Sequence, residues 1–246
     1  MAAEDHADKT ADPIPEKGES PQMFDRIAHR YDLVNRVLTL RLDVRWRKKL
    51  AAMFPDRDNL AVLDVACGTG DVLTIGLKQR KNVSLGVGLD PAARMMARGR
   101  DKARECGLAE RIAFVRGDAL RLPFADGSFD VVTISFGIRN VTDVPRALAE
   151  MHRVLAPGGR VLVLEFSFPE NRALRAAYLV YLRHILPRIG AAISGDAAAY
   201  RYLDRTVESF PYGEAFCDLL RRAGFAAVRP RPLTFGVATV YSGEKK

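Results

Sequence analysis

The stretch from Val62 to Asp71, which reads VLDVACGTGD, constrains the fold of this chain more than any other feature. An apolar run leads directly into a Gly-x-Gly turn at Gly68 and Gly70. Glycines at these positions let the backbone turn tightly and let a ligand approach the main chain closely. Such turns follow buried strands at the rim of α/β sheets, where nucleotide-like cofactors bind, so the stretch predicts a cofactor loop. A plain tight turn is the alternative.

The acid that closes this turn indicates the charge of the cofactor. A dinucleotide-binding loop has a third glycine three residues after the second, and a helix N-terminus that is free to receive pyrophosphate. In this chain the third position is Leu73, and Asp71 occupies the place of the anion. Because a carboxylate repels a pyrophosphate and attracts a cation, we expect a positively charged nucleoside. S-adenosyl-L-methionine, which carries a sulfonium and an ammonium group, fits this description.

The composition is that of one globular domain with a polar tail. The chain has 246 residues, of which 48% are hydrophobic, and a formal net charge of +8. These values predict a single domain over residues 21–246. Residues 1–20 are polar and acidic and are expected to be disordered. The basic balance is compatible with nucleic acid, an anionic membrane surface or acidic substrates, and does not choose among them.

Scattered cysteines favour a reducing, cytoplasmic location. Cys67, Cys106 and Cys217 form no CxxC pair, so neither a zinc site nor a disulfide framework is predicted. The four histidines show no ligand spacing, and we expect no metal. We also find no secretory signal and no apolar run long enough to span a bilayer.

From residue 61 onward, strand-like apolar runs alternate with helix-like segments. Strands are predicted at 61–66, 83–89, 111–115, 129–135 and 160–166, with late strands at Val228 and 234–241. Alternation of this kind implies right-handed βαβ units and a mostly parallel sheet. The predicted class is therefore α/β, with a ligand site at the carboxyl ends of the strands.

Two regions depart from this alternation. Residues 24–54 carry apolar side chains at helical spacing and are predicted to be helical, with the basic run at 45–49 as a solvated face. Residues 168–210 break the rhythm and are predicted to be an inserted helical cap. In the cap, arginines interrupt an apolar stripe at Arg172, Arg175, Arg183 and Arg188. Such a segment could bind an anionic membrane surface, line a hydrophobic substrate channel or pack on its own domain, and the sequence does not choose among these three.

Acids at the ends of the next two strands extend the predicted cofactor site. Asp90 follows Gly70 by about twenty residues, the spacing that places a carboxylate beside a ribose diol. Asp118 ends the third strand and is expected to accept a hydrogen bond from the adenine amino group, beside the backbone amide of Ala119. Thr69 offers a hydroxyl and an amide in the glycine loop. Three such sites at successive strand ends are hard to explain by chance.

The fourth predicted strand ends in the loop 135–140, SFGIRN, at the position that faces the methyl group in such a fold. An N-methyltransferase for nucleobases or glutamine is expected to show Asn/Asp-Pro-Pro-Tyr/Phe there, and this motif is absent. The chain also lacks a Pro-Cys nucleophile for attack on a pyrimidine ring. The loop therefore argues against two classes of nucleic-acid methyltransferase.

Longer signatures make the chain resemble a known family. They are the segment 31–46, which begins YDLVN, and the segment 153–167, which reads RVLAPGGRVLVLEFS. The loop 135–140 and the segment 196–211 are also family-like. From about Met23 to its C-terminus, the chain is similar to the ubiquinone/menaquinone biosynthesis C-methyltransferases. It departs from the family pattern at Val34, Thr39, Asp43 and Ala156.

This resemblance implies a fold, a cofactor and a cofactor site. The fold is that of class I S-adenosylmethionine-dependent methyltransferases, a Rossmann-like sheet of seven mostly parallel strands with N-terminal helices and an inserted cap. The family's cofactor contacts fall on Thr69, Asp90, Asp118, Ala119 and Ser135. Together with Gly68 and Gly70 of the loop, they make up the predicted cofactor site.

The implied reaction moves a methyl group from a sulfonium to a ring carbon of a polyprenylated quinol, either demethylmenaquinol or 2-methoxy-6-polyprenyl-1,4-benzoquinol. The quinone is electrophilic, so the reduced form must be the substrate. We expect Arg139 to stabilise the phenolate oxygen, because a guanidinium is a poor proton acceptor. Asn140 would donate a hydrogen bond or orient a water, and Tyr31 would lie at the substrate mouth. No metal is needed for a sulfonium electrophile.

Other functions remain compatible with the sequence. The positive charge suits an RNA methyltransferase, although no RNA-binding module is evident and we expect no nucleic-acid partner. A cofactor-binding subunit without activity, or a methyltransferase for another lipid-like molecule, would share the cofactor half. Peripheral contact with the inner face of the cytoplasmic membrane and a homodimer are options that the sequence leaves open.

Overall fold

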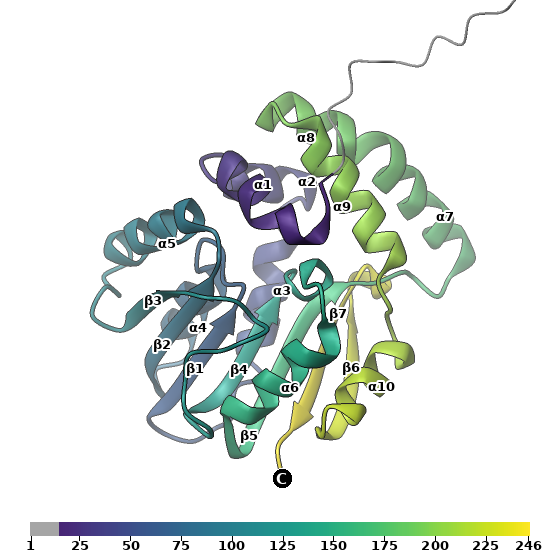
Figure 1. Cartoon of the computed structure of the whole chain (residues 1–246). Helices are drawn as coiled ribbons and strands as arrows, with labels where there is room; N and C mark the ends of the chain where they lie inside the picture. The colour runs from purple at the N-terminus through teal and green to yellow at the C-terminus, as the bar shows by residue number, and fades with distance from the viewer. Residues whose placement is uncertain (1–14) are drawn as a thin grey trace, which may run out of the picture.

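A seven-stranded sheet forms the centre of the molecule in the computed structural model, which describes residues 15–246 (Figure 1). The strands are β1 (Leu60–Val65), β2 (Val83–Asp90), β3 (Ile112–Arg116), β4 (Phe129–Ser135), β5 (Leu155–Phe166), β6 (Ala226–Leu233) and β7 (Ala238–Glu244). Their order across the sheet is β3-β2-β1-β4-β5-β7-β6. β1 to β5 pair in parallel, whereas β7 is antiparallel to both β5 and β6. The predicted mostly parallel α/β sheet is confirmed.

The strand order reverses beside β1. The chain runs outward from β1 to β2 and β3, and then returns to the other side of β1 with β4. Loops that follow neighbouring strands diverge at such a reversal, and a crevice opens at the carboxyl ends of the strands. The glycine loop after β1 and the loop 135–140 after β4 therefore border one crevice.

Helices cover both faces of the sheet. On one face, α6 (Val144–Val154) and α10 (Glu214–Arg222) enclose an apolar core. On the other, α3 (Leu42–Ala51), α4 (Asp71–Gln79) and α5 (Ala93–Glu105) enclose a second core. β4 is buried along nearly its whole length, as a strand covered on both faces should be.

The N-terminal region departs from its prediction in two ways. Helical structure begins at η1 (Lys17–Glu19) and α1 (Ser20–Ile27), with Ser20 buried, so the predicted tail is too long at its end; residues 1–14 lie outside the described residues. The helix predicted over 24–54 is divided, because Leu40 (φ 50°) and Arg41 (φ 62°) reverse the chain. This break separates α2 (Tyr31–Leu38) from α3.

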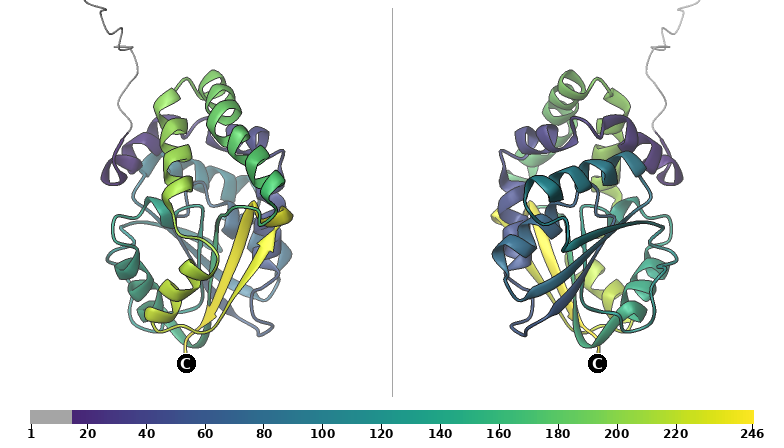
Figure 2. Two further views of the ribbon diagram at one scale, coloured as in Figure 1. Left: turned by 90° about the vertical axis from the view of Figure 1, so that its right-hand side faces the viewer. Right: turned by 90° about the vertical axis from the view of Figure 1, so that its left-hand side faces the viewer.

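The predicted cap corresponds to three helices and a π-helical turn. These are α7 (Arg172–Val180), the π turn η3 (Tyr181–Ile185), α8 (Leu186–Ser194) and α9 (Ala197–Ser209). Figure 2 shows them gathered with the N-terminal helices at the end opposite the C-terminus. A third apolar core joins the two groups, with Met23 and Val34 from one side and Leu182 and Tyr200 from the other.

The last predicted strand is wrong in its first residues. Residues 234–241 were expected to be one strand, but Thr234–Gly236 forms a 3-10 turn, and β7 begins at Ala238. The positive φ of Phe235 (57°) is incompatible with a strand. Within residues 15–246, none of the helices has the length and apolarity needed to cross a bilayer.

Candidate functional site

A polar cavity of about 160 Å³ lies over the carboxyl ends of the strands. The N-terminal helices close it from above with Lys17, Phe24 and other residues. Seven of the predicted site residues line it: Tyr31, Gly68, Asp90, Asp118, Ala119, Ser135 and Asn140. Residues far apart in the sequence are thus brought to one place because their strands end at the same edge of the sheet.

Asp90 ties two loops of this cavity together. Its Oδ2 accepts a hydrogen bond from the backbone N–H of Gly68 at 2.8 Å, and its Oδ1 accepts one from Ala92 at 2.8 Å. Burial raises the pKa of Asp90 to about 6, although both backbone hydrogen bonds oppose this shift. Each carboxylate oxygen keeps a lone pair, so the side chain can still accept hydrogen bonds from ligand hydroxyls.

Two polar atoms of the cavity wall have no partner among residues 15–246. The Oγ of Ser135 and the Oδ1 of Asn140 are buried and make no hydrogen bond. Leaving such a group unsatisfied costs about 1–3 kcal/mol, so buried polar groups nearly always have a partner. With the carboxylates of Asp90 and Asp118 in the same cavity, these atoms fit a ligand with the hydroxyls and amino group of an adenosine.

The residues that directly follow β1 and β4 have an unusual backbone conformation. Ala66 (φ 51°) and Phe136 (φ 58°), which follow these strands, are in the left-handed region. A Cβ at Gly137 would meet the Cβ of Ala66 at 2.7 Å, so only glycine fits there. Strained residues of this kind cluster at ligand sites, where the surrounding structure holds them in place.

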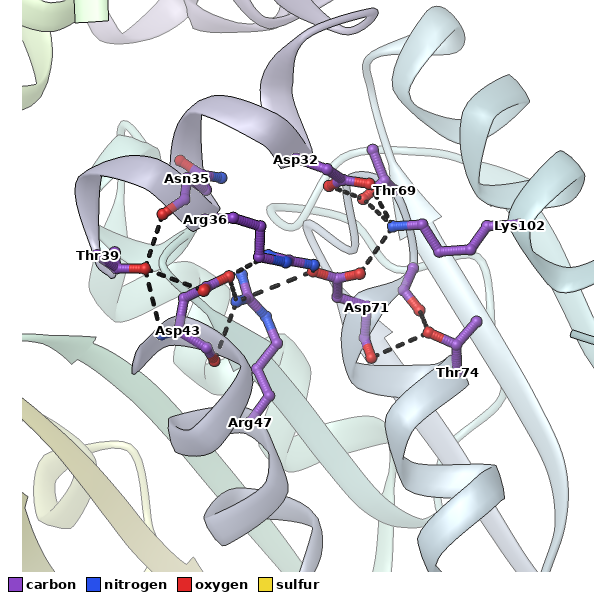
Figure 3. Close-up of polar contacts among 11 residues, drawn as sticks. Asp32, Asn35, Arg36, Thr39, Asp43, Arg47, Thr69, Asp71, Thr74 and Lys102 are labelled. Atoms are coloured by element: carbon purple, nitrogen blue, oxygen red, sulfur yellow. Dashed lines mark hydrogen bonds and ion pairs between the residues drawn. The ribbon is translucent and has the colours of Figure 1, made fainter. Parts of the chain in front are cut away.

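Thr69 and Gly70 have neighbours within the protein instead. The Thr69 hydroxyl donates to Asp32 at 2.7 Å and accepts from Lys102 at 2.9 Å (Figure 3). Gly70 has a φ of 71° at the start of α4, and a Cβ there would meet the ring of Phe114 at 2.9 Å. Both stay predictions as cofactor contacts.

The structure corrects the role that the sequence suggested for Asp71. Its carboxylate is ion-paired with Arg36 at 2.5 Å and with Lys102 at 2.7 Å, and Arg47 lies 3.9 Å away (Figure 3). Burial would raise the pKa of Asp71, but the cations of Arg47, Lys102 and Arg36 outweigh it and hold this pKa below its usual range. Its charge is therefore compensated by the chain itself and does not select a cationic cofactor.

A second, apolar cavity of about 440 Å³ lies between the N-terminal helices and the cap. Aromatic side chains contribute much of its wall, among them Trp46, Phe166, Tyr178, Tyr181, Tyr200 and Tyr202. Phe24, Tyr31 and Phe136 line both this cavity and the polar one. The two cavities therefore share a wall, which is the arrangement that a reaction between a polar and an apolar molecule requires.

Arg139 lies in the wall of the apolar cavity, bound to a buried acid. Its Nη1 donates to Oε1 of Glu165 at 2.9 Å and to the backbone oxygen of Phe136 at 2.5 Å. The guanidinium also lies over the Phe166 ring, 5.4 Å from the ring centroid. Its sequence neighbour Asn140 lines the polar cavity. The loop 135–140 thus serves both cavities with adjacent residues.

Tyr31 lines both cavities and acts there as a neutral group. Burial raises the pKa of its phenol above the ordinary value, although the cation of Arg47 and a hydrogen bond with Asn35 oppose the shift. At neutral pH the hydroxyl therefore keeps its proton. It can donate a hydrogen bond to an anionic oxygen, but it does not serve as a ready base.

Sequence reasoning missed two buried charged residues: Arg47 in the wall of the apolar cavity, and Glu165, which is ion-paired with the wall residue Arg139. Arg47 was placed on a solvated face, but it is buried, lines the cavity and is ion-paired with Asp43 at 2.9 Å. No local signal separates it from its exposed neighbours. Glu165 had a signal, because a carboxylate in the apolar run of a buried strand needs a partner. No group of His, Cys, Asp or Glu that could hold a metal occurs in the described part of the chain.

Curated proteins from other organisms are similar over nearly the whole chain. The demethylmenaquinone methyltransferase of Thermus thermophilus is 48% identical over 223 residues, which are 91% of this chain and 100% of that protein. The enzyme of the same name from Deinococcus radiodurans is 47% identical over 94% of this chain and 95% of its own. The ubiquinone/menaquinone biosynthesis C-methyltransferase UbiE of Dinoroseobacter shibae is 43% identical over 91% of this chain and 89% of its own.

Solved structures with a similar fold include methyltransferases. A SAM-dependent methyltransferase from Thermotoga maritima covers 92% of this chain and 99% of its own, with a TM-score of 0.63 at 21% identity. The [4+2]-cyclase SpnF covers 96% and 99%, with a TM-score of 0.61 at 20% identity. These likenesses support the class I methyltransferase fold. The model of the ubiE/COQ5 methyltransferase family matches residues 16–245, and the chain belongs to this family.

Proposed function

We propose that this chain transfers the methyl group of S-adenosyl-L-methionine to a ring carbon of a polyprenyl quinol, either demethylmenaquinol or 2-methoxy-6-polyprenyl-1,4-benzoquinol. The observation that carries the proposal is the wall of Phe24, Tyr31 and Phe136, shared by a polar and an apolar cavity. The names of the similar methyltransferases from Thermus thermophilus and Dinoroseobacter shibae support the choice of substrate.

The polar cavity would hold the cofactor through residues that the sequence already suggested. Asp90 would accept hydrogen bonds from the ribose hydroxyls, and Asp118 one from the adenine amino group. Ser135 would satisfy its unpartnered oxygen on the ligand, and so would Asn140, which the sequence had suggested as a catalytic residue rather than as a cofactor contact. When bound, S-adenosyl-L-methionine supplies a methyl group that its sulfonium makes electrophilic. The family membership and the fold support this cofactor.

The protein's own contribution is positioning, exclusion of water and charge. The apolar cavity would orient the quinol ring against the shared wall, and positioning of this kind contributes about 7–11 kcal/mol to a reaction barrier. The guanidinium of Arg139 would stabilise the phenolate oxygen that makes the neighbouring ring carbon nucleophilic. Tyr31, which keeps its proton, would donate a hydrogen bond to the same class of oxygen.

The direct test is methyl transfer by the purified chain. Each quinol, kept reduced by dithionite, is incubated with methyl-labelled S-adenosyl-L-methionine. We expect label in the ring of at least one quinol, and none when the reductant is left out. Cofactor binding without label in either quinol would contradict the proposal and favour a cofactor-binding subunit. In cells that lack this protein, the desmethyl quinone that accumulates identifies the natural substrate.

The cofactor site has a test of its own in Ser135. Its hydroxyl has no partner in the described part of the chain, so Ser135→Ala removes an unsatisfied buried group from the unliganded protein. In the liganded protein the same substitution removes a hydrogen bond to the cofactor. We expect an unchanged or higher melting temperature together with cofactor binding weakened by about 2- to 10-fold. Calorimetric titration measures the second quantity. Lower stability with unchanged affinity would make Ser135 structural.

The alternatives are separated by simple outcomes. A tight, salt-sensitive RNA complex would favour an RNA methyltransferase. Labelling of another lipid but of neither quinol would change the substrate. A cytoplasmic location with peripheral contact at the inner face of the membrane stays part of the proposal, as does a homodimer, which light scattering would detect.

A further inference from the structure

Exposed aliphatic side chains occur on the long helix of the cap and on α2, which packs against the α8 part of that helix. α7, η3 and α8 run as one helix from Arg172 to Ser194, and α7 buries none of its residues. Clustered exposed apolar side chains mark interaction sites rather than ordinary surface. We call the following residues the docking strip: Leu33, Val37, Leu40, Val180, Ile185 and Ile189, which are 38–83% exposed.

The docking strip is continuous with the mouth of the apolar cavity. Val37, Leu40 and Ile189 are exposed to solvent and also line the cavity, so they form its rim. The phenol of Tyr181 donates to the backbone oxygen of Leu38 at 2.5 Å and fixes the cap helix against the end of α2. A ligand that enters through this rim therefore passes directly from the apolar surface into the cavity.

The charge of the same helix indicates what the strip contacts. Residues 172–194 include four arginines and no aspartate or glutamate. Arg183 is paired with Glu208 of α9 at 2.6 Å, and Arg175 lies over the Phe168 ring. Arg172 and Arg188 form no ion pair with the described residues, so their charges are available to an outside partner.

These charges favour a lipid surface over a second copy of the chain. A symmetric dimer brings the same patch of both copies together, and here it would oppose arginines with arginines. An anionic bilayer instead attracts each arginine and accepts the aliphatic side chains between its headgroups. Charge complementarity and apolar exposure thus point to the same occupant.

We propose that the docking strip binds the surface of an anionic lipid bilayer, with the mouth of the apolar cavity turned toward the acyl chains. The consequence for catalysis rests on the proposed function, because a polyprenyl quinol would then enter from the membrane without crossing water. The binding itself does not depend on that function, and it can be measured without quinol or cofactor.

The test is sedimentation of the purified full chain with vesicles. Phosphatidylcholine vesicles are compared with vesicles that also contain phosphatidylglycerol. We expect binding to the anionic vesicles, weakened about tenfold or more by the double substitution Val180→Asp/Ile185→Asp. Neither residue lines the cavity, so labelling of a short-tailed, water-soluble quinol should stay at the wild-type rate.

Leu85 provides the matched control. It is 41% exposed in β2, near the amino end of the strand and away from the cap, so Leu85→Asp adds the same charge at a similar exposure. This variant should bind vesicles like the wild type. Equal binding by the wild type and the double variant, or no binding by the wild type, would overturn the proposal. So would a light-scattering mass of two chains that falls to one in the double variant, since the strip would then be a dimer interface.

Depth of insertion gives a second, independent measurement. The single tryptophan, Trp46, is buried and supplies a constant background. In Val180→Trp the new indole should be quenched by lipids with brominated acyl chains, and in Leu85→Trp it should not. Quenching that is equal in the two variants would contradict docking through the strip.

Discussion

The ion pair of Arg139 and Glu165 links the proposed chemical role of Arg139 to the stability of the fold. Both side chains are almost fully buried, and one oxygen of Glu165 and the Nε of Arg139 have no further partner. Burial raises the pKa of Glu165, whereas the guanidinium lowers it. Removing the arginine alone therefore leaves an uncompensated buried acid, and a loss of activity would be ambiguous.

A pair of variants separates the two roles of Arg139. Arg139→Ala should lower the free energy of unfolding by about 3–5 kcal/mol, the cost of breaking a buried ion pair. Arg139→Met with Glu165→Gln should recover most of that loss, because no charge is left buried. Neither variant should transfer methyl groups, while cofactor affinity by calorimetry should stay near the wild-type value. Wild-type turnover in the double variant would remove Arg139 from the mechanism.

If Asp90 binds the ribose as proposed, cofactor affinity should depend on pH. Ligand hydroxyls donate to the ionised form, and burial has raised the pKa of this group to about 6. Affinity for S-adenosyl-L-homocysteine should therefore be constant well above pH 6 and fall by up to about tenfold per pH unit below it. In Asp90→Ala the affinity should be lower at every pH and this slope should vanish. Wild-type affinity in the variant would contradict the ribose assignment.

Site residues at strand ends could be predicted from the sequence, but their partners could not. Asp90, Asp118 and Ser135 follow apolar runs, and strands of a parallel sheet end at one edge. The cations around Asp71 come from α2, α3 and α5, and no spacing rule joins residues on separate helices. The charge on Asp71 therefore suggested a ligand where the structure supplies its own cations.

Among the helices, α2 is the element on which both cavities depend. It carries Tyr31 in the shared wall, and its Asp32 and Arg36 are anchored to the glycine loop and to α5 through Lys102 and Asp71 (Figure 3). The Lys102 ammonium lies 2.5 Å from Asp32 and 2.7 Å from Asp71, so one cation joins three elements. The position of Tyr31 in the wall shared by the two cavities is thereby coupled to the glycine loop.

Removing that cation should loosen α2 more than it affects the sheet. We expect Lys102→Met to lower the free energy of unfolding by about 1–3 kcal/mol, the value of charged hydrogen bonds. Amide exchange in residues 20–38 should become faster, and the KM for the quinol should rise more than kcat falls. Hydrogen exchange by mass spectrometry and steady-state kinetics measure these effects.

Lys78→Met is the matched control for this prediction. Lys78 is exposed on α4, and its ammonium contacts the sulfur of Cys106 at 3.0 Å rather than a carboxylate. This variant should leave amide hydrogen exchange in residues 20–38 and the KM for the quinol unchanged. Unaltered exchange in residues 20–38 of the Lys102 variant would show that α2 is held by its apolar contacts alone.

Elements with a strong period could be predicted, whereas breaks without a sequence signal could not. β4 is a largely apolar and buried segment, and its predicted bounds, 129–135, are those observed. The turn between α2 and α3 uses Leu40 and Arg41 at positive φ, where glycine or asparagine would have been the signal. The placement of β7 between β5 and β6 is a matter of strand pairing that no local pattern reports.

At the scale of the whole molecule, the proposed site is divided between the sheet and the cap. The sheet supplies the polar cavity, and the cap with the N-terminal helices supplies the apolar one. At about 440 Å³, the apolar cavity lies in the lower half of the range for ligand pockets. It is therefore large enough for a quinol ring and the first part of a prenyl tail, and the remainder must leave through the rim.

Because only the first part of the prenyl tail fits in the apolar cavity, turnover should depend on the length of the tail. In the wild type, kcat/KM should rise by about tenfold or more for the first prenyl unit, since even one methylene in an apolar pocket contributes about 1–3 kcal/mol. The value of kcat/KM should stop rising once further prenyl units lie outside the apolar cavity. Val207 is buried in α9 and lines the cavity, so Val207→Phe should bring the plateau to shorter tails. A tail-less quinol should react as before, because the added ring shortens the space for the tail and not the wall beside the polar cavity.

Ala176→Phe adds a ring of the same kind on the exposed face of α7 and serves as the comparison. Its tail-length profile should match the wild type, and cofactor affinity should be unchanged in both variants. Overpacking by Val207→Phe costs about 1–3 kcal/mol, so the profiles are compared below the melting transition of each variant. If the plateau of Val207→Phe stays at the wild-type length, the tail does not pass through the cap. The apolar cavity would then hold the ring alone, and the rim of the docking strip would have no part in substrate entry.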